Sequence, residues 1–261
     1  MNDAPHPSMI GIPRRVFVLP DSLKAYASMD EQAVATMETH EEKDLAAAVL
    51  DRDLVLLLGG LGGDLGGWAL SLVGRVARIL GDTTVAFATV PFTAEGALRR
   101  QAAGSQLDLL RTKTDAVVTF ANDDLLRLAP DLPLARSFAV LGGIMARAAS
   151  GLGSCVARSD VVPLRRFLRR SRDWRFGMGA GTETHRSFLA MDEAYRSPWF
   201  TGRPEDVRQA VLLVGQPAEA DLGKEVLHEL QVRSPSADIA WAILPEPTAG
   251  DRLTVHVFVG L

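Results

Sequence analysis

Short, nearly continuous apolar runs alternate with segments of helical periodicity through the first half of the chain. Apolar runs of four to eight residues are typical of buried strands, whereas apolar positions every three or four residues are typical of amphipathic helices. The expected strands cover 15–19, 53–59, 83–90 and 115–121, and the expected helices cover 30–50, 68–80 and 95–113. Because strands and helices alternate and the strands are apolar throughout, we predict an α/β fold with a parallel sheet covered on both faces.

The second half of the chain begins with a long apolar segment rich in small residues. The pattern predicts one helix over 132–157, apolar around much of its circumference and therefore buried between two bodies. Further on it predicts a basic amphipathic segment at 163–175, a strand and turn at 175–181, helices at 183–196 and near 220–232, and strands at 209–215, 238–244 and 252–260. We therefore expect an α/β domain over 1–131, a core helix over 132–157 and a smaller mixed α/β domain over 158–261.

Composition and charge narrow the class of protein. The chain has 261 residues, of which 47% are hydrophobic and 23% charged, as in ordinary soluble globular proteins. Its net charge of -4 argues against nucleic acid as the partner. A single cysteine excludes an internal disulfide, and the N-terminus lacks the pattern of a signal peptide. We therefore expect a cytoplasmic protein.

The stretch LLLGGLGGDLGGWAL, residues 56–70, concentrates glycines between an expected strand and an expected helix. Glycine lets backbone N–H groups approach phosphate oxygens, and a helix N-terminus adds partial positive charge. The alternative is a tight turn that only packs the helix against a neighbour. No lysine follows the glycines as in a P-loop, and the spacing GxGxxxG differs from the dinucleotide-binding fingerprint.

A series of short motifs follows in a fixed order along the chain. They are GLGGDLGGW (60–68), TVPFTAEG (89–96), ANDDLL (121–126), GMGAG (177–181) and SPWF (197–200). In the same order they resemble the GMGGGTGTG, TKPFxFEG, PNDKLL, GSG-type turn and SPLL motifs of FtsZ, the bacterial relative of tubulin. The resemblance implies a tubulin-like fold with a nucleotide-binding α/β domain, a core helix and a smaller second domain.

The same resemblance implies a site for GTP or GDP. The residues that it assigns to nucleotide binding are Gly60, Gly62, Gly63, Gly66, Gly67, Glu95, Arg99, Asn122 and Phe138. Phe138 holds the position that the family places against the guanine base, while the charged and amide residues match contacts to ribose, phosphate and base. Their alternative roles are a helix N-terminal acid, a surface arginine and a turn asparagine.

Several positions depart from the family pattern. The family's two threonines fall on Leu65 and Gly67, and its guanine-reading aspartate falls on Gly143. Asp64 adds a negative charge where a polyphosphate would lie. The family's first strand and its GGGGGNA-type loop have no counterpart before the glycine motif, so we expect both to be absent. These departures predict weak or absent GTP binding.

The family hydrolyses GTP between subunits with a loop of pattern NxDxxD, which matches RSDVVP at 158–163. Asp160 holds the first acid position and is the candidate catalytic residue, whereas Pro163 replaces the second acid and Arg158 the asparagine. The alternative role of Asp160 is a helix N-cap, since one carboxylate alone activates water poorly. The histidines show no metal-ligand spacing, so no metal site is expected.

Three functions remain open at this point. The first is an FtsZ/tubulin-like cytoskeletal or cell-division protein, degenerate in GTP binding and hydrolysis. Such a protein acts by head-to-tail self-assembly, or by binding a filament protein or a membrane surface through the basic segment 163–175. The second is an active GTP-hydrolysing filament protein of the same family with a shortened N-terminus, and the third is a small-molecule enzyme on a doubly wound sheet. The hydroxyl groups and carboxylates that the family has and this sequence lacks favour the first function.

Overall fold

The computed structural model describes residues 40–157, 160–216, 221–244 and 251–260, so the strand expected at 15–19 lies outside the described residues. The strands are β1 (Leu54–Gly60), β2 (Thr83–Val90), β3 (Ala116–Ala121), β4 (Asp173–Gly181), β5 (Gln209–Gly215), β6 (Asp238–Ile243) and β7 (Leu253–Gly260). The helices are α3 (His40–Val49), α4 (Gly66–Ile79), α5 (Ala97–Lys113), α6 (Asn122–Leu128), α7 (Leu134–Cys155), α8 (Val161–Leu168), α9 (Arg186–Arg196) and α10 (Gly223–Arg233), with single 3-10 turns η2 (Thr93–Glu95) and η4 (Pro204–Asp206).

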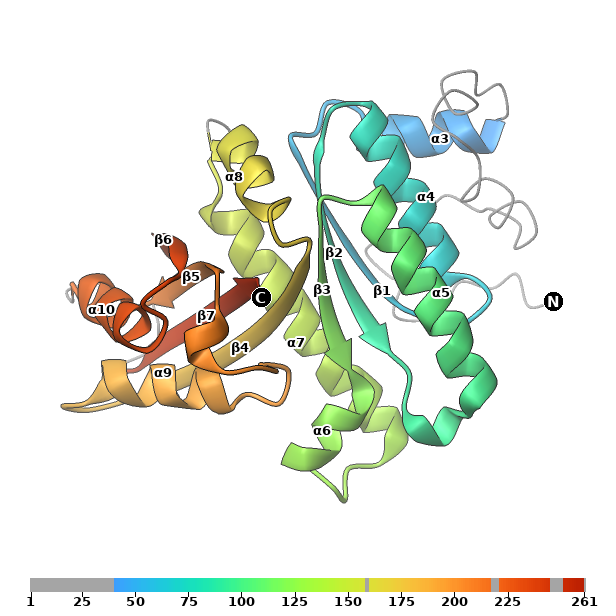
Figure 1. Cartoon of the computed structure of the whole chain (residues 1–261). Helices are drawn as coiled ribbons and strands as arrows, with labels where there is room; N and C mark the ends of the chain where they lie inside the picture. The colour runs from blue at the N-terminus through green and yellow to red at the C-terminus, as the bar shows by residue number, and fades with distance from the viewer. Residues whose placement is uncertain (1–39, 158–159, 217–220, 245–250, 261) are drawn as a thin grey trace.

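The seven strands of the described part form one sheet in the order β1-β2-β3-β4-β7-β5-β6. β1 to β4 run parallel, as the apolar sequences of β1, β2 and β3 predict, and β7 lies antiparallel between β4 and β5. Figure 1 shows β1, β2 and β3 together on one side of the molecule and β4, β7, β5 and β6 on the other. The α/β fold class is therefore confirmed, with a mixed sheet in the second half.

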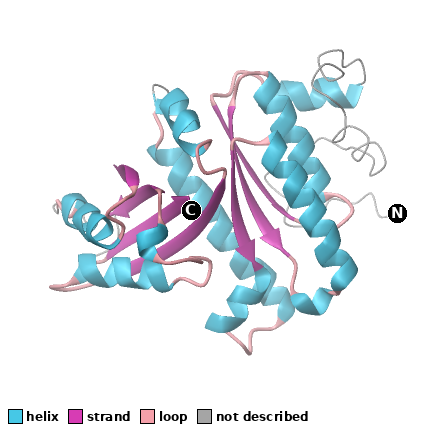
Figure 2. Cartoon of the chain, in the orientation of Figure 1, coloured by secondary structure: helices cyan, strands magenta, loops and turns pink. Residues whose placement is uncertain are grey.

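Alternate residues of the parallel strands face two different cores. Ala86 and Ala88 of β2 pack toward α4 and α5, whereas Val85 and Phe87 pack in the core that includes α7. Helices α4 and α5 lie side by side on one face of the sheet (Figures 1 and 2), which is where right-handed β–α–β connections place them. The parallel strands are thus held between a helical layer and the long helix α7.

The two halves of the sheet share one hydrophobic core although few backbone pairs join them. β3 and β4 pair at only two positions. Phe120 of β3 packs on Phe176 of β4 with ring centroids 5.6 Å apart and on Trp199 at 5.9 Å. The indole N–H of Trp199 donates a hydrogen bond to the carbonyl of Ala121 at 3.1 Å. Because side chains from both halves bury one another, we expect the halves to unfold together, and the domain division at 131 and 157 stays a prediction.

Mild proteolysis is accordingly expected to yield no pair of separately stable fragments divided near residue 160. Cleavage in an exposed loop should leave pieces that remain associated through the shared aromatic core. Limited trypsin digestion, followed by size-exclusion chromatography and denaturing electrophoresis, measures this. Two folded fragments that elute apart would contradict the shared core.

Helix α7 differs from the expected helix in its burial. Leu141, Met145 and Leu152 are buried in the shared core, but Phe138 and Val140 are 47% and 40% exposed. The prediction of burial between two bodies is therefore wrong for one side of the helix. That side combines alanine, glycine, serine and arginine with these two large apolar residues, so the apolar circumference of α7 is wider than its buried stripe. Residues 136–155 are long and apolar enough to cross a membrane, and Leu141, Met145 and Leu152 within them pack in the shared core.

The motif GMGAG lies within β4 and does not form the expected turn. Its three glycines face α9. A Cβ added at Gly177 would lie 2.3 Å from the carbonyl oxygen of Ala194, and one added at Gly179 would lie 2.1 Å from that of Ala190. Glycine at these positions lets the helix backbone lie directly on the strand, so the motif serves packing within the second half.

The basic segment 163–175 is shorter as a helix than expected. α8 ends at Leu168, and β4 begins at Asp173. Four of its arginines bond within the chain: Arg165 to the hydroxyl of Thr83, Arg169 to Asp115, Arg170 to Asp238, and Arg175 to the hydroxyls of Thr119 and Thr201. These guanidinium groups already have partners within the chain, so less positive charge is available to attract a membrane surface or an acidic partner. Contact with either one stays a prediction.

Candidate functional site

A cavity of about 560 Å³ lies where β1 and β2 end, beside the first half of α7. The carboxyl ends of the parallel strands meet here, which is where open α/β sheets bind their ligands. Six of the predicted site residues line it, namely Gly60, Gly63, Glu95, Arg99, Asn122 and Phe138. The structure therefore brings together residues that lie far apart in the sequence.

The other three predicted glycines shape the loop and do not line the cavity. Gly62 has a φ of +86°, in the left-handed region that favours glycine. A Cβ at Gly66 would lie 2.0 Å from the carbonyl oxygen of Gly60, and a Cβ at Gly67 would lie 2.4 Å from Oε1 of Gln106. Both interpretations of the glycine loop (residues 60–67) therefore apply. These three glycines form a tight turn, and the backbone of Gly60 and Gly63 lines the cavity.

The charged side chains of the cavity neutralise each other. Nη1 of Arg99 lies 3.0 Å from Oε2 of Glu95, and Oε1 of Glu95 accepts the backbone N–H of Phe92 at 2.8 Å. No other charged residue of the described chain lines the cavity, so this part of the lining carries no net charge. Within the described part of the chain, no group of three His, Cys, Asp or Glu side chains is placed to hold a metal ion. A polyphosphate would meet little compensating charge here.

The remaining wall is apolar and aromatic, with one buried polar acceptor. Phe138 packs edge-on against Phe92 with ring centroids 5.8 Å apart, and Leu141 and Met145 of α7 continue the surface. Asn122 is only 2% exposed, and its Oδ1 has no hydrogen-bond partner in the described structure. A buried acceptor without a partner is suited to an N–H group of a ligand.

Gln106 of α5 is a site residue that the sequence analysis missed. Its Oε1 accepts the N–H of Gly62 at 2.7 Å, and its Nε2 donates to the carbonyl of Gly63 at 2.8 Å. The residue is 2% exposed and lies on the buried side of α5 with Ala103 and Leu110. A polar residue in register with buried apolar positions is the one signal in the sequence that could have identified it.

Asp160 lies apart from this cavity, immediately before α8 and beyond the far end of α7. It lines a separate cavity with Leu152 and Cys155, and the two cavities share no lining residue. Its side chain makes no N-cap hydrogen bond to α8, so the structure does not support the alternative capping role. Any action of Asp160 on a ligand of the glycine loop therefore needs a second copy of the chain. Arg158 lies outside the described residues.

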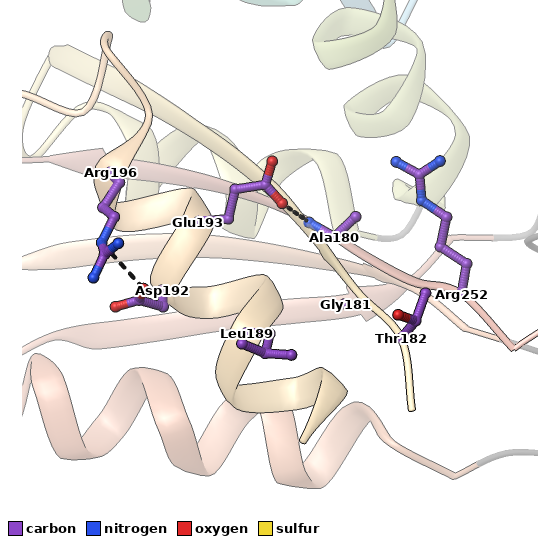
Figure 3. A pocket seen from close by; sticks show the side chains of 8 residues that line it. All are labelled: Ala180, Gly181, Thr182, Leu189, Asp192, Glu193, Arg196 and Arg252. Atoms are coloured by element: carbon purple, nitrogen blue, oxygen red, sulfur yellow. Dashed lines mark hydrogen bonds and ion pairs between the residues drawn. The ribbon is translucent and has the colours of Figure 1, made fainter. Parts of the chain in front are cut away.

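Another cavity, of about 550 Å³, lies at the end of β4 beside α9 and contains none of the predicted site residues (Figure 3). Its carboxylates are engaged: Glu193 accepts the N–H of Ala180 at 2.7 Å, and Asp192 pairs with Arg196 at 3.1 Å. Figure 3 shows Arg196 and Arg252 on opposite sides of this hollow. The cavity at the glycine loop is the better candidate site because it joins the predicted residues to an unpaired buried acceptor.

No protein-family model matches the chain. An individual relative is similar to it: the cell division protein FtsZ of Methanothermobacter thermautotrophicus is 30% identical over 211 residues. The matched region covers 77% of this chain and 55% of that protein. The chain therefore spans little more than half the length of this curated relative.

Solved structures share the fold. The empty FtsZ dimer of M. jannaschii matches with a TM-score of 0.78 and 25% identity, covering 88% of this chain and 68% of that one. CetZ2 from Haloferax volcanii, in a GTPγS-bound protofilament, matches with a TM-score of 0.67 and 18% identity, covering 88% and 72%. The second likeness bears on the fold alone. Together these matches confirm the tubulin-like fold.

Proposed function

We propose that this chain, a divergent member of the FtsZ/tubulin superfamily, is a cytoplasmic assembly protein of the cell-division or cytoskeletal type that is degenerate in GTP binding and turnover. Its relative is named a cell division protein, and the solved FtsZ structure at 25% identity is described as a dimer. Self-association is the property that we carry over from that dimer to this chain. In our proposal the chain keeps this property and makes little use of the nucleotide.

The charge balance of the cavity is the observation that carries the proposal. Among the described residues, Arg99 is its single cationic lining residue, and Glu95 lies 3.0 Å away and cancels that charge. The hydroxyl groups that the family resemblance places at 65 and 67 are replaced by Leu65 and Gly67. A triphosphate bound here would leave strongly hydrated charges without matched partners, which is unfavourable.

The alternative, an active GTP-binding and GTP-hydrolysing filament protein, has one observation in its favour. The cavity of about 560 Å³ lies within the range of small-molecule sites, and Asn122 offers it a buried acceptor. Under this alternative, the six lining residues hold the nucleotide and Asp160 of a neighbouring copy acts on it. The GTP titration and the sedimentation experiment in the Discussion separate the two functions.

We propose that copies associate head to tail, with the glycine loop of one copy against the Asp160 end of the next. The two ends differ, so the contact is heterologous and can extend into a filament. Leu65 in the glycine loop is 49% exposed, so its side chain is available for burial against a neighbouring copy. Burial of this side chain between copies would contribute to association.

Leu65→Asp is therefore expected to raise the protein concentration needed for assembly by about tenfold or more, since about 1.4 kcal/mol corresponds to tenfold. Sedimentation velocity over a concentration series measures this shift. Leu189→Asp is the matched control, because Leu189 on α9 is 46% exposed and lies away from both proposed ends. An unchanged concentration for Leu65→Asp, or an equal shift in both variants, would refute this interface.

A further inference from the structure

We propose that Gln106 is a built-in plug of the glycine loop. By this we mean that its side-chain amide hydrogen-bonds to the backbone of the loop and takes the place of a phosphate group. Gln106 is then a specificity-determining residue, because the cavity selects an uncharged ligand of nucleoside size over a polyphosphate. The inference rests on the proposed function and deepens it, because it gives a structural cause for the weak binding of GTP.

The first support is that Gln106 already satisfies the backbone of the loop. The N–H of Gly62 donates to its Oε1 at 2.7 Å, and the carbonyl of Gly63 accepts from its Nε2 at 2.8 Å. The N–H of Gly62 is therefore already paired and is not a donor available to a phosphate oxygen. In this structure the donor points to a side chain of the protein itself.

The second support is the space that the plug fills. A Cβ added at Gly67 would lie 2.4 Å from Oε1 of Gln106, 2.5 Å from its Cδ and 2.7 Å from its Cβ. Every one of these distances is too short, including the one to the Cβ of Gln106, which cannot swing away. The family resemblance places a threonine at 67, so the plug and that threonine exclude each other. Glycine at 67 and glutamine at 106 therefore form a matched pair.

The third support is that the plug is held in place. Gln106 is 2% exposed, and both ends of its amide are hydrogen-bonded, so its displacement would leave buried polar groups unpaired. The loop is also constrained at Gly62, whose φ is +86° and whose missing Cβ would lie 2.6 Å from the carbonyl oxygen of Arg99. Neither partner can move without cost to the other.

The groups that remain free in the cavity indicate the class of ligand. The Glu95–Arg99 pair leaves no net charge, Phe138 offers a partly exposed aromatic ring, and Oδ1 of Asn122 is an unpaired buried acceptor. These groups fit a flat ring that carries an N–H donor and no phosphate chain. An uncharged nucleoside has this chemistry.

The test compares wild type with Gln106→Ala, Gly67→Thr and the double variant, titrated calorimetrically with guanosine and with inorganic triphosphate. Gln101→Ala is the matched control, because Gln101 is an exposed glutamine on the same helix. We expect wild type and Gln101→Ala to bind guanosine at least tenfold more tightly than triphosphate. The double variant should bind triphosphate at least tenfold more tightly than wild type does. Gly67→Thr alone should lower the melting temperature. The added Gln106→Ala removes the clashes with Oε1 and Cδ but keeps the Cβ, so it should restore part of the loss.

Amide hydrogen exchange gives a readout that does not depend on any ligand. In Gln106→Ala the amide of Gly62 should exchange at least tenfold faster than in wild type, and in Gln101→Ala its rate should be unchanged. This single variant only removes atoms, so it decides the question even where the double variant does not fold.

An unchanged Gly62 exchange rate in Gln106→Ala would overturn the plug, as would a folded double variant whose triphosphate affinity stays within twofold of wild type. The proposed function would survive either result. Tight binding of GTP by the wild-type chain would instead overturn the proposed function, whatever the variants do. The two failures are therefore distinguishable.

Discussion

Calorimetric titration of GTP into the purified chain is expected to show a Kd weaker than about 1 mM, or no binding. Two hydroxyl groups and one base-reading carboxylate that the family resemblance places in the site are replaced by Leu65, Gly67 and Gly143. Each hydrogen bond to a charged group contributes about 1.5–3 kcal/mol, so the three losses together correspond to several orders of magnitude in affinity.

Variants that add one group back serve as controls for this result. A Cβ at Gly143 would meet nothing within 4 Å, so Gly143→Asp places a carboxylate on the exposed side of α7 without a clash. If the missing acid contributes to the weak binding, Gly143→Asp should tighten the GTP affinity by about tenfold, and Gly143→Ala should leave it unchanged. A micromolar Kd for GTP binding to the unmodified chain would refute the proposal that this site has lost its affinity for GTP.

A large stability effect is expected at Asp115, whose replacement by alanine should lower the free energy of unfolding by about 1–3 kcal/mol. Asp115 is 1% exposed. Its Oδ2 accepts the backbone N–H of Thr84 at 2.8 Å, and its Oδ1 lies 2.5 Å from Nε of Arg169. The carboxylate thus ties β2 and β3 to α8, and its loss leaves a buried N–H and a guanidinium without their partner.

Urea denaturation followed by circular dichroism measures this effect. Asp238→Ala is the control, since Asp238 pairs with Arg170 at 2.6 Å but the two side chains are 55% and 60% exposed. An exposed pair contributes about 0–1 kcal/mol, so this control should change stability little. Equal destabilisation by the two variants would show that burial of Asp115 does not determine its contribution.

The parallel half of the fold follows closely from the sequence. The strand expected at 83–90 is observed as Thr83–Val90, and that expected at 115–121 as Ala116–Ala121, because unbroken apolar runs have few alternatives to a buried strand. The burial of α7 was predicted less well. Apolar composition does not show which side of a helix meets the core, and on α7 one stripe is buried while Phe138 and Val140 are exposed.

The candidate site was predictable in part for the same reason. Parallel strands end at one edge of the sheet, so motifs that follow successive strands meet there, as Gly60, Glu95 and Asn122 do. The contact of Gln106 with the glycine loop depends on how α5 packs beside α4, which no local pattern encodes. The packing role of the GMGAG motif could not be predicted from the sequence either, because the close contact of α9 with β4 arises only in the tertiary structure.

Sedimentation of the purified chain with GTP, with GDP and without nucleotide, with phosphate release followed in the same samples, tests most directly whether assembly is independent of nucleotide turnover. The proposed function predicts the same concentration-dependent sedimentation under all three conditions and no phosphate release above the buffer rate. Assembly that requires GTP and is accompanied by steady phosphate release would contradict it and would identify an active GTPase.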